Sequence, residues 1–223
     1  MASRVFYLSA NGDSDEVAPV FGVASNSTRN ESAGRGKVTF FNFEGNDLVL
    51  RHYRRGGLPA KFSRDRYWWQ GLANTRAWRE FHLLQTLESM HLPAPRPYAA
   101  RVEKSRMFYR ADIVTHEIDG AVSLMDRVRS ADFDSGIFEQ TGAVIAQFHR
   151  AGVNHVDLNA SNIVLDKNGD VHLLDFDRCK IEAAKNDDWK QGNLDRLQRS
   201  LKKSFPDFDA RLWQALLGGY TNC

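Results

Sequence analysis

Strand-like and helix-like patterns of apolar residues divide the chain into two halves. In the first half, residues 34–41 and 48–53 flank a turn over 42–47, and residues 98–102 and 107–118 are rich in β-branched and aromatic side chains. Such runs, bounded by turn residues, predict strands. Residues 1–33 are rich in Ser, Asn, Asp and Gly, which predicts a loosely ordered extension with one strand near residues 5–8.

Helical periodicity first appears over residues 75–90. Glu80 falls on the apolar stripe of this predicted helix. A carboxylate facing the core is costly without a cation, so we expect Arg51, on the preceding strand, to pair with it. The alternative is that Glu80 lies at the edge of the stripe and is solvated. The apolar members of the stripe are Ala77, Phe81, Leu84 and Leu87.

Further helices are predicted for the second half of the chain. Residues 137–151 are amphipathic and end at Gly152, and shorter periodic stretches cover 193–203 and 210–217. Between them, the apolar runs 163–165 and 171–174 flank an Asn-Gly turn, which predicts a rigid hairpin. Strands followed by helices indicate an α+β fold, divided into an N-lobe over 34–116 and a helical C-lobe over 117–223.

Composition and charge are those of an ordinary globular protein. The 223 residues include 30 Lys and Arg against 28 Asp and Glu, and only two cysteines, which is compatible with a reducing cytosol. No apolar run approaches the length of a membrane span, and residues 1–10 lack the features of a signal peptide. We therefore expect a soluble cytoplasmic protein, with attachment to a membrane surface left open.

Residues 51–69 have the most unusual composition in the chain. Six Arg and Lys residues share this segment with one acid, and aromatic side chains are interleaved. Guanidinium groups and aromatic faces suit a phosphorylated or carboxylated partner with a lipid or sugar body. Nucleic acid is disfavoured, because no recognised binding module accompanies the segment and the net charge is only +2. The alternative is a solvated basic face over a few core aromatics.

Residues 155–177 concentrate the acidic chemistry. The predicted hairpin would bring Asp157 and Asn162 close to Asp175. The segment from His155 resembles the kinase catalytic loop H-R-D-L-x-x-x-N, and Asp175-Phe176-Asp177 resembles D-F-G. This resemblance implies that Asp157 is the catalytic base and that Asn162 and Asp175 bind Mg²⁺, while His155 braces the loop. Asn159 replaces the usual Lys, and an acidic hairpin with Asx turns is the alternative interpretation.

Other residues match nucleotide-binding parts of kinases. Gly34 and Gly36 precede a strand as in a Gly-rich loop over the ATP phosphates, although Thr39 occupies the third glycine position. Arg51 stands where kinases carry a phosphate-pairing Lys, with Glu80 as its helix partner. The segment from Glu117 to Gly120 resembles a hinge, where backbone groups of Glu117 and Ile118 would pair with an adenine edge.

Together these segments resemble the bacterial lipopolysaccharide kinase family, and within it the kinases of 3-deoxy-D-manno-octulosonic acid (Kdo). The resemblance rests on DLVLRHYRRGGL, RAWREF, LPAPRP, HVDLNASNIVLD and LLDFDRCKI, and runs from about Gly34 to Arg199. It implies a minimal two-lobed protein-kinase-like fold with a reduced C-terminal lobe and with ATP and Mg²⁺ as cofactors. The implied reaction is phosphorylation of the 4-hydroxyl of Kdo on Kdo-lipid A precursor by a peripheral protein on the cytoplasmic side of the inner membrane.

Two alternative functions remain open at this stage. Only 46 residues follow Asp177, and no A-P-E triplet is present, which favours a small or lipid-linked acceptor over a protein. That acceptor could be a heptose or another small molecule, such as an aminoglycoside. The departures at Thr39, Arg51 and Asn159 would also suit a nucleotide-binding pseudokinase scaffold, whereas the presence of Asp157, Asn162 and Asp175 together argues against one.

Overall fold

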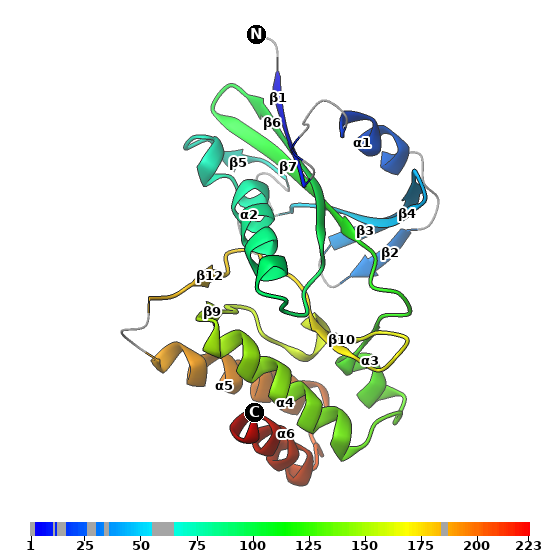
Figure 1. Cartoon of the computed structure of the whole chain (residues 1–223), viewed down its shortest axis with the longest axis vertical. Coiled ribbons are helices and arrows are strands. Elements are labelled where there is room, and N and C mark those ends of the chain that lie inside the picture. Colours follow the sequence, from blue (N-terminus) through cyan, green and yellow to red (C-terminus); the bar gives the residue numbers. More distant parts are fainter. Residues whose placement is uncertain are drawn as a thin grey trace. The chain divides into compact units, whose positions relative to one another are not determined.

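The chain is described by a computed structural model that covers residues 3–10, 12, 17–25, 30–33, 36–54, 65–183 and 187–223. It divides into two compact units (Figure 1), which are Met1–Thr86 with Pro95–Glu117, and Leu87–Ala94 with Ile118–Cys223. Helices and antiparallel sheets make this an α+β fold. No helix in the described ranges has the length and apolar character needed to cross a membrane.

The first unit is built on an antiparallel sheet. Its strands lie in the order β1-β6-β7-β4-β3-β2, with the short β5 paired to β7. The hairpin of β3 and β4 turns through Glu44 and Gly45, both with positive φ. The predicted strands of this unit are therefore present, and their bounds are β1 Arg4–Ser9, β2 Asn30–Ala33, β3 Gly36–Phe43, β4 Asn46–His52, β5 Tyr67–Trp68, β6 Pro97–Ser105 and β7 Phe108–His116.

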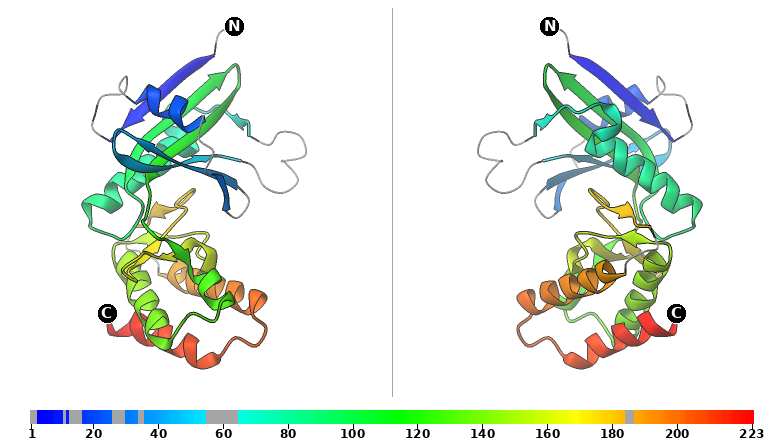
Figure 2. Two further views of the ribbon diagram at one scale, coloured as in Figure 1. Left: turned by 90° about the vertical axis from the view of Figure 1, so that its right-hand side faces the viewer. Right: turned by 90° about the vertical axis from the view of Figure 1, so that its left-hand side faces the viewer.

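The N-terminal segment is more ordered than its composition predicts. Strand β1 pairs with β6 over six residues (Figure 2), and helix α1 (Ala18–Ser25) buries Val20 and Phe21 in a cluster with Leu48 and Val114. The strand predicted near residues 5–8 is confirmed by β1, whereas α1 was not predicted. A few apolar side chains within a polar stretch are enough to hold them, because each buried one contributes about 1.5–3 kcal/mol.

Helix α2 (Arg76–Ser89) follows a short 3₁₀ turn, η2 (Leu72–Asn74). The predicted stripe is confirmed, because Ala77, Phe81, Leu84 and Leu87 are all buried. Glu80 belongs to the same face and is only 4% exposed. The alternative of a solvated Glu80 is therefore wrong.

The second unit contains the predicted hairpin. Strands β10 (Ile163–Leu165) and β11 (Val171–Leu173) pair antiparallel, and β8 (Val122–Ser123) pairs with β10 on the other side. The turn is held by Asp166, whose Oδ1 accepts the backbone N–H groups of Asn168 at 2.8 Å and Asp170 at 2.9 Å. Gly169 completes it at φ 88°. The hairpin prediction is confirmed.

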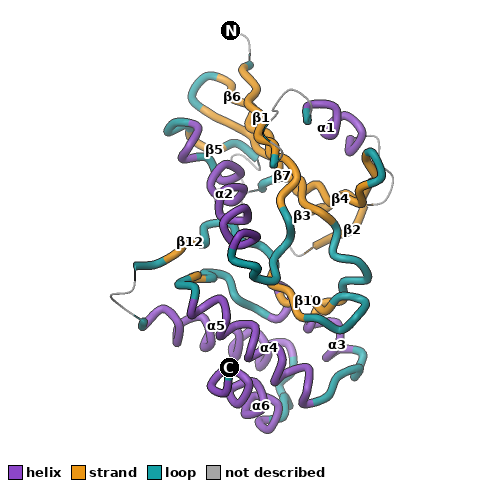
Figure 3. Tube along the Cα trace, in the orientation of Figure 1, coloured by secondary structure: helices purple, strands orange, loops and turns teal. Residues whose placement is uncertain are grey.

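Helices make up the rest of this unit (Figure 3), namely α3 (Leu124–Arg129), α4 (Ser135–Arg150), α5 (Asp188–Ser204) and α6 (Ala210–Asn222). Asp134 caps the start of helix α4, because its side chain accepts the N–H of Ile137 at 3.0 Å, and after the helix the chain turns through Gly152 at φ 77°. It continues as β9 (Val153–Asn154), which pairs with β12 (Lys180–Ile181). Helix α4 therefore leads directly into the acidic segment.

Helices α4 and α6 approach each other closely through two glycines. A Cβ placed on Gly142 would lie 1.9 Å from the backbone oxygen of Leu216, and one on Gly219 would lie 1.9 Å from that of Glu139. Both positions exclude any side chain. The last helix of the chain is thus packed backbone to backbone against the helix that precedes the acidic segment.

Candidate active site

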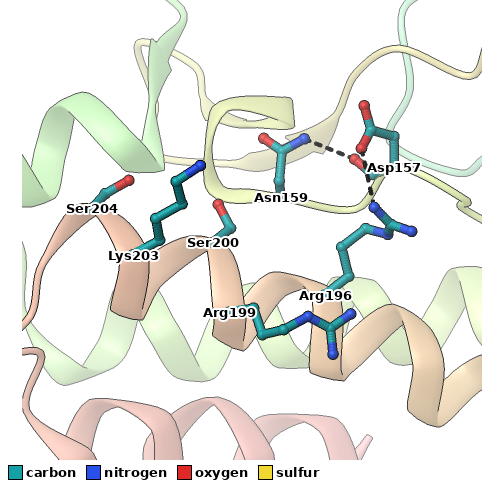
Figure 4. Close-up of a pocket in the computed structure, with 7 residues that line it drawn as sticks. All are labelled: Asp157, Asn159, Arg196, Arg199, Ser200, Lys203 and Ser204. Carbon is teal, nitrogen blue, oxygen red and sulfur yellow. Dashed lines mark hydrogen bonds and ion pairs between the residues drawn. The ribbon is translucent and has the colours of Figure 1, made fainter.

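Asp157 lies in a tightly bonded loop of the second unit. Its backbone carbonyl accepts two side-chain amide N–H bonds, from Asn159 and Asn162, each at 2.9 Å. The loop continues into a 3₁₀ turn, η3 (Ala160–Asn162), and Oδ1 of Asn159 accepts the N–H of Ser161 at 2.9 Å. The Asp157 carboxylate is 41% exposed and lies 3.8 Å from Nη1 of Arg196 (Figure 4). The loop therefore fixes the backbone of Asp157 while its carboxylate remains accessible.

Two hydrogen bonds to Leu174 join this loop to the residue before Asp175. The N–H of Leu174 donates to the carbonyl of Asn162 at 2.8 Å, and Nε2 of His155 donates to the carbonyl of Leu174 at 2.9 Å. Asp175 itself has φ 61°, a left-handed conformation that is uncommon outside glycine. Asp157, Asn162 and Asp175 are thus held on one connected backbone framework. The predicted bracing role of His155 is confirmed by its bond to Leu174.

His155 is neutral in this position. Burial lowers the pKa of its imidazole, although the hydrogen bond to Leu174 and the charge of Asp175 act in the opposite direction. A carbonyl oxygen can only accept, so Nε2 carries the proton. The backbone N–H of His155 donates to Oδ1 of Asn193 at 3.0 Å, and the Phe176 ring packs edge-on at 5.0 Å. These contacts give the imidazole a structural role.

The donor atoms of Asn162 and Asp175 suit a hard cation. Because the Asn162 amide nitrogen donates to Asp157, its oxygen is the atom left to bind a metal, and Asp175 supplies a carboxylate. Mg²⁺ prefers oxygen ligands and usually takes only one or two from protein, the rest coming from water and phosphates. Among the described residues, no group of three or more His, Cys, Asp and Glu side chains is placed to hold a metal ion. The set fits a shared protein–phosphate site.

In the first unit, the expected ion pair between Arg51 and Glu80 is confirmed. Arg51, on β4, donates to one carboxylate oxygen of Glu80, and the hydroxyl of Tyr53 donates to the other. The Arg51 guanidinium also lies over the Tyr53 ring, 5.0 Å from its centroid. Tyr53 was not expected from the sequence, because the strand pattern alone does not show which side chain reaches Glu80. The role of Arg51 and Glu80 in nucleotide binding stays a prediction.

Only some of the other residues predicted to bind the nucleotide lie in the described part of the chain. Gly34 lies outside the described residues, and Gly36 begins β3 opposite Ala33. The N–H of Glu117 donates to the carbonyl of Asp47 at 2.9 Å, and the carbonyl of Ile118 accepts the N–H of Ala121 at 3.2 Å. An adenine edge would therefore need the remaining backbone groups of these two residues. Of the basic segment, residues 55–64 lie outside the described residues.

A pocket beside Asp157 was not predicted. It is open, has a volume of about 390 Å³, and is bounded on one side by the Asp157 loop and on the other by α5 (Figure 4). Three cations of α5 line it at a spacing of three and four residues. The helical spacing of these cations can be read from the sequence, but the loop that faces them cannot, because it lies far from α5 along the chain. The lining residues are Asp157, Asn159, Arg196, Arg199, Ser200, Lys203 and Ser204.

Comparison with known proteins shows the family to which this chain belongs. The sequence model of the lipopolysaccharide kinase (Kdo/WaaP) family matches residues 24–220, and the chain belongs to this family. It is similar to the 3-deoxy-D-manno-octulosonic acid kinase of Vibrio vulnificus strain YJ016, with 38% identity over 98% of this chain and 94% of that protein. The protein of the same name from Stenotrophomonas maltophilia strain K279a is 46% identical over 76% of this chain and 68% of its own length.

Proposed function

We propose that this protein is an ATP-dependent kinase that phosphorylates Kdo, at the 4-hydroxyl of the sugar on Kdo-lipid A precursor, in lipopolysaccharide core synthesis. The observation that carries the proposal is the backbone framework that joins Asp157, Asn162 and Asp175. The relatives named as Kdo kinases support the choice of acceptor.

In this proposal, Asp157, Asn162 and Asp175 of the second unit each have a defined role. Asp157 accepts the proton of the sugar hydroxyl and orients its oxygen for attack on the γ-phosphorus of ATP. The ester bond forms at that oxygen as the bond between the γ-phosphorus and the bridging oxygen breaks, and ADP leaves. Asn162 and Asp175 would hold Mg²⁺, which neutralises charge on the phosphates. In phosphoryl transfer, positioning and charge stabilisation supply most of the rate enhancement.

Residues of the first unit, together with Ile118 of the second, are assigned to the nucleotide. Arg51, fixed by Glu80, would bind the phosphates with its guanidinium fork, and Gly34 and Gly36 would let backbone N–H groups approach them. Backbone groups of Glu117 and Ile118 would contact the adenine edge. The exposed Trp68, next to the basic segment, would meet the glycolipid at the cytoplasmic surface of the inner membrane, where the protein would bind peripherally.

The direct test is mass spectrometry of Kdo-lipid A precursor after incubation with the protein and MgATP. A mass increase of one phosphate, localised to the Kdo residue, is expected. Heptose-containing acceptors and an aminoglycoside serve as competing substrates in the same assay. Phosphate on one of those acceptors and none on Kdo would refute the proposal, as would nucleotide binding without turnover on any acceptor.

The role of Asp157 is tested with Asp157→Asn. The amide keeps the shape but cannot take the proton, so kcat should fall about 10²–10⁴-fold, the range that general base catalysis supplies. The matched control is Asp195→Asn on the exposed face of α5, for which kcat should stay unchanged. Thermal unfolding of both variants should match that of the wild type. Undiminished activity of Asp157→Asn would exclude the base role.

A further inference from the structure

Two of the three α5 cations that line the pocket, Arg199 and Lys203, differ from most other described cations of this unit, which pair with carboxylates. Arg127 pairs with Asp132, Lys190 with Asp187 and Arg211 with Asp209. In the described part of the chain, by contrast, neither Arg199 nor Lys203 forms an ion pair, and both side chains are exposed within the pocket. Two free cations on one pocket wall define a site that attracts an anion.

Helix geometry places Arg199 and Lys203 as neighbours on one face of α5. Positions 199 and 203 are one turn apart, which places their Cβ atoms about 5–6 Å from each other. An Arg fork and a Lys ammonium at that separation can share the two oxygens of one carboxylate or those of a phosphate. Ser200 and Ser204 add hydroxyl groups on the same wall. The site therefore offers charge and hydrogen-bond donors to a single oxyanion.

Asp157, on the opposite wall of the pocket, would orient an anionic ligand bound there. Its carboxylate repels a second anion and accepts a hydroxyl proton, while α5 attracts the anion. A sugar acid would therefore bind with its acid group against α5 and a hydroxyl toward Asp157. The volume of about 390 Å³ is within the range of pockets that bind single small ligands.

We infer that Arg199 and Lys203 form the binding site for the carboxylate of the acceptor sugar, and so determine which of its hydroxyls reaches Asp157. This inference rests on the proposed function, and it deepens that function by giving the acceptor a recognition site. Arg196, whose Nη1 lies 3.8 Å from Asp157, belongs to the same wall and leaves Arg199 and Lys203 to the substrate.

The first experiment compares kinetics of Arg199→Ala, Lys203→Ala and the double variant with those of the wild type. Lys202→Ala is the control, because it removes the same charge from the same helix outside the pocket. Each pocket substitution should lower kcat/KM for Kdo-lipid A precursor about tenfold, and the double variant about 100-fold, as expected for charge-assisted hydrogen bonds of about 1.5 kcal/mol each. The KM for ATP should stay within about twofold, whereas a site for an ATP phosphate would raise it.

The second experiment removes the anion from the substrate. With the Kdo carboxylate converted to its methyl ester, the wild type should lose about the same 100-fold, and the double variant should lose nothing further. If the double variant still had a lower kcat/KM than the wild type with the methyl ester as substrate, the inference would be overturned. Activity of the double variant equal to that of Lys202→Ala on the acid would do the same, while leaving the kinase assignment intact.

A binding measurement separates failure of this inference from failure of the proposed function. If the wild type transfers no phosphate to Kdo-lipid A precursor, the proposed function fails. Titration of the wild type and the double variant with free Kdo, followed by NMR chemical shifts, then decides the binding site. Weaker binding by the double variant supports the site, and equal binding or none by the wild type refutes it.

Discussion

At the residue scale, Asn159 explains a departure from the kinase pattern. Its side chain donates to the carbonyl of Asp157 and accepts from the N–H of Ser161, so it both fixes the loop and caps the 3₁₀ turn. A Lys could donate but not accept. The cation nearest to the Asp157 carboxylate comes instead from Arg196 on α5. The motif around Asp157 could be predicted from its local spacing. The contact between Asp157 and Arg196 could not, because these two residues are far apart in sequence and meet only after folding.

Arg51 should contribute to stability as well as to nucleotide binding. In Arg51→Ala, the buried carboxylate of Glu80 keeps the Tyr53 hydroxyl but loses its cation. The free energy of unfolding should fall by about 2 kcal/mol, less than for a fully buried pair because Arg51 is 27% exposed. Urea unfolding measures the change.

A second substitution tests the electrostatic cause of that loss. Adding Glu80→Gln to Arg51→Ala removes the unpaired charge, so part of the stability should return. Arg79→Ala, an exposed neighbour on α2, is the control and should change the free energy of unfolding by less than about 0.5 kcal/mol. No recovery in the double variant would contradict the ion-pair account.

His149 predicts a dependence of stability on pH. Burial among the helices lowers the pKa of its imidazole from 6.5 to about 4, and Nδ1 contacts the Tyr220 hydroxyl at 2.9 Å. Because the folded-state pKa is the lower one, the unfolded chain takes up the proton first as the pH falls. The free energy of unfolding should therefore decrease between about pH 6.5 and pH 4, by up to about 3 kcal/mol.

Urea unfolding at several pH values measures this dependence. In His149→Gln, which keeps a polar side chain but does not titrate, the slope of unfolding free energy against pH should be smaller over this range. The exposed His82→Gln is the control and should leave the slope unchanged. An identical slope in wild type and His149→Gln would show that other groups cause the dependence.

At the element scale, the contact between α4 and α6 holds the helical part of the second unit. Gly142 and Gly219 allow backbone to meet backbone there. The apolar periodicity of both helices was predictable, and so was the end of α4 at Gly152. The identity of the helix that packs on α4 was not, because a glycine in a helical pattern does not reveal which backbone comes close to it.

Gly142→Ala should disrupt this contact. The added methyl group would overlap the backbone oxygen of Leu216, so the helices must move apart, and we expect a loss of about 3 kcal/mol in unfolding free energy. Gly218→Ala on α6 is the matched control, since nothing lies within 4 Å of its added Cβ. That variant should be neutral or more stable by up to about 1 kcal/mol, because alanine favours helices. Equal thermal midpoints for the two variants would argue against close packing.

At the scale of the whole molecule, the sequence was informative about the α+β class, the hairpin, the acidic segment and the first strand, and it did not reveal helix α1. Motif-bearing segments carry strong local signals, such as the Asn-Gly turn. Helix α1 carries a weak signal, because its order depends on packing against a sheet assembled from strands far along the chain. The anion-binding wall of α5 was missed for the same reason, since the facing loop is distant in sequence.

Phe21→Ala tests whether the N-terminal segment is part of the first unit. The side chain is 1% exposed and packs with Leu48 and Val114, so its loss should lower the free energy of unfolding by about 3–5 kcal/mol. Val23→Ala in the same helix is the control, because Val23 is 41% exposed and its loss should cost less than about 0.5 kcal/mol. Identical urea midpoints for the two variants would restore the view of a loosely attached extension.

The glycine contact between α4 and α6 also fixes an order of events during synthesis. Helix α4 leaves the ribosome well before α6, and its Gly142 surface lacks the α6 backbone as a partner until α6 has been made. A growing chain therefore exposes the Gly142 surface of α4 until α6 has followed it out of the ribosome.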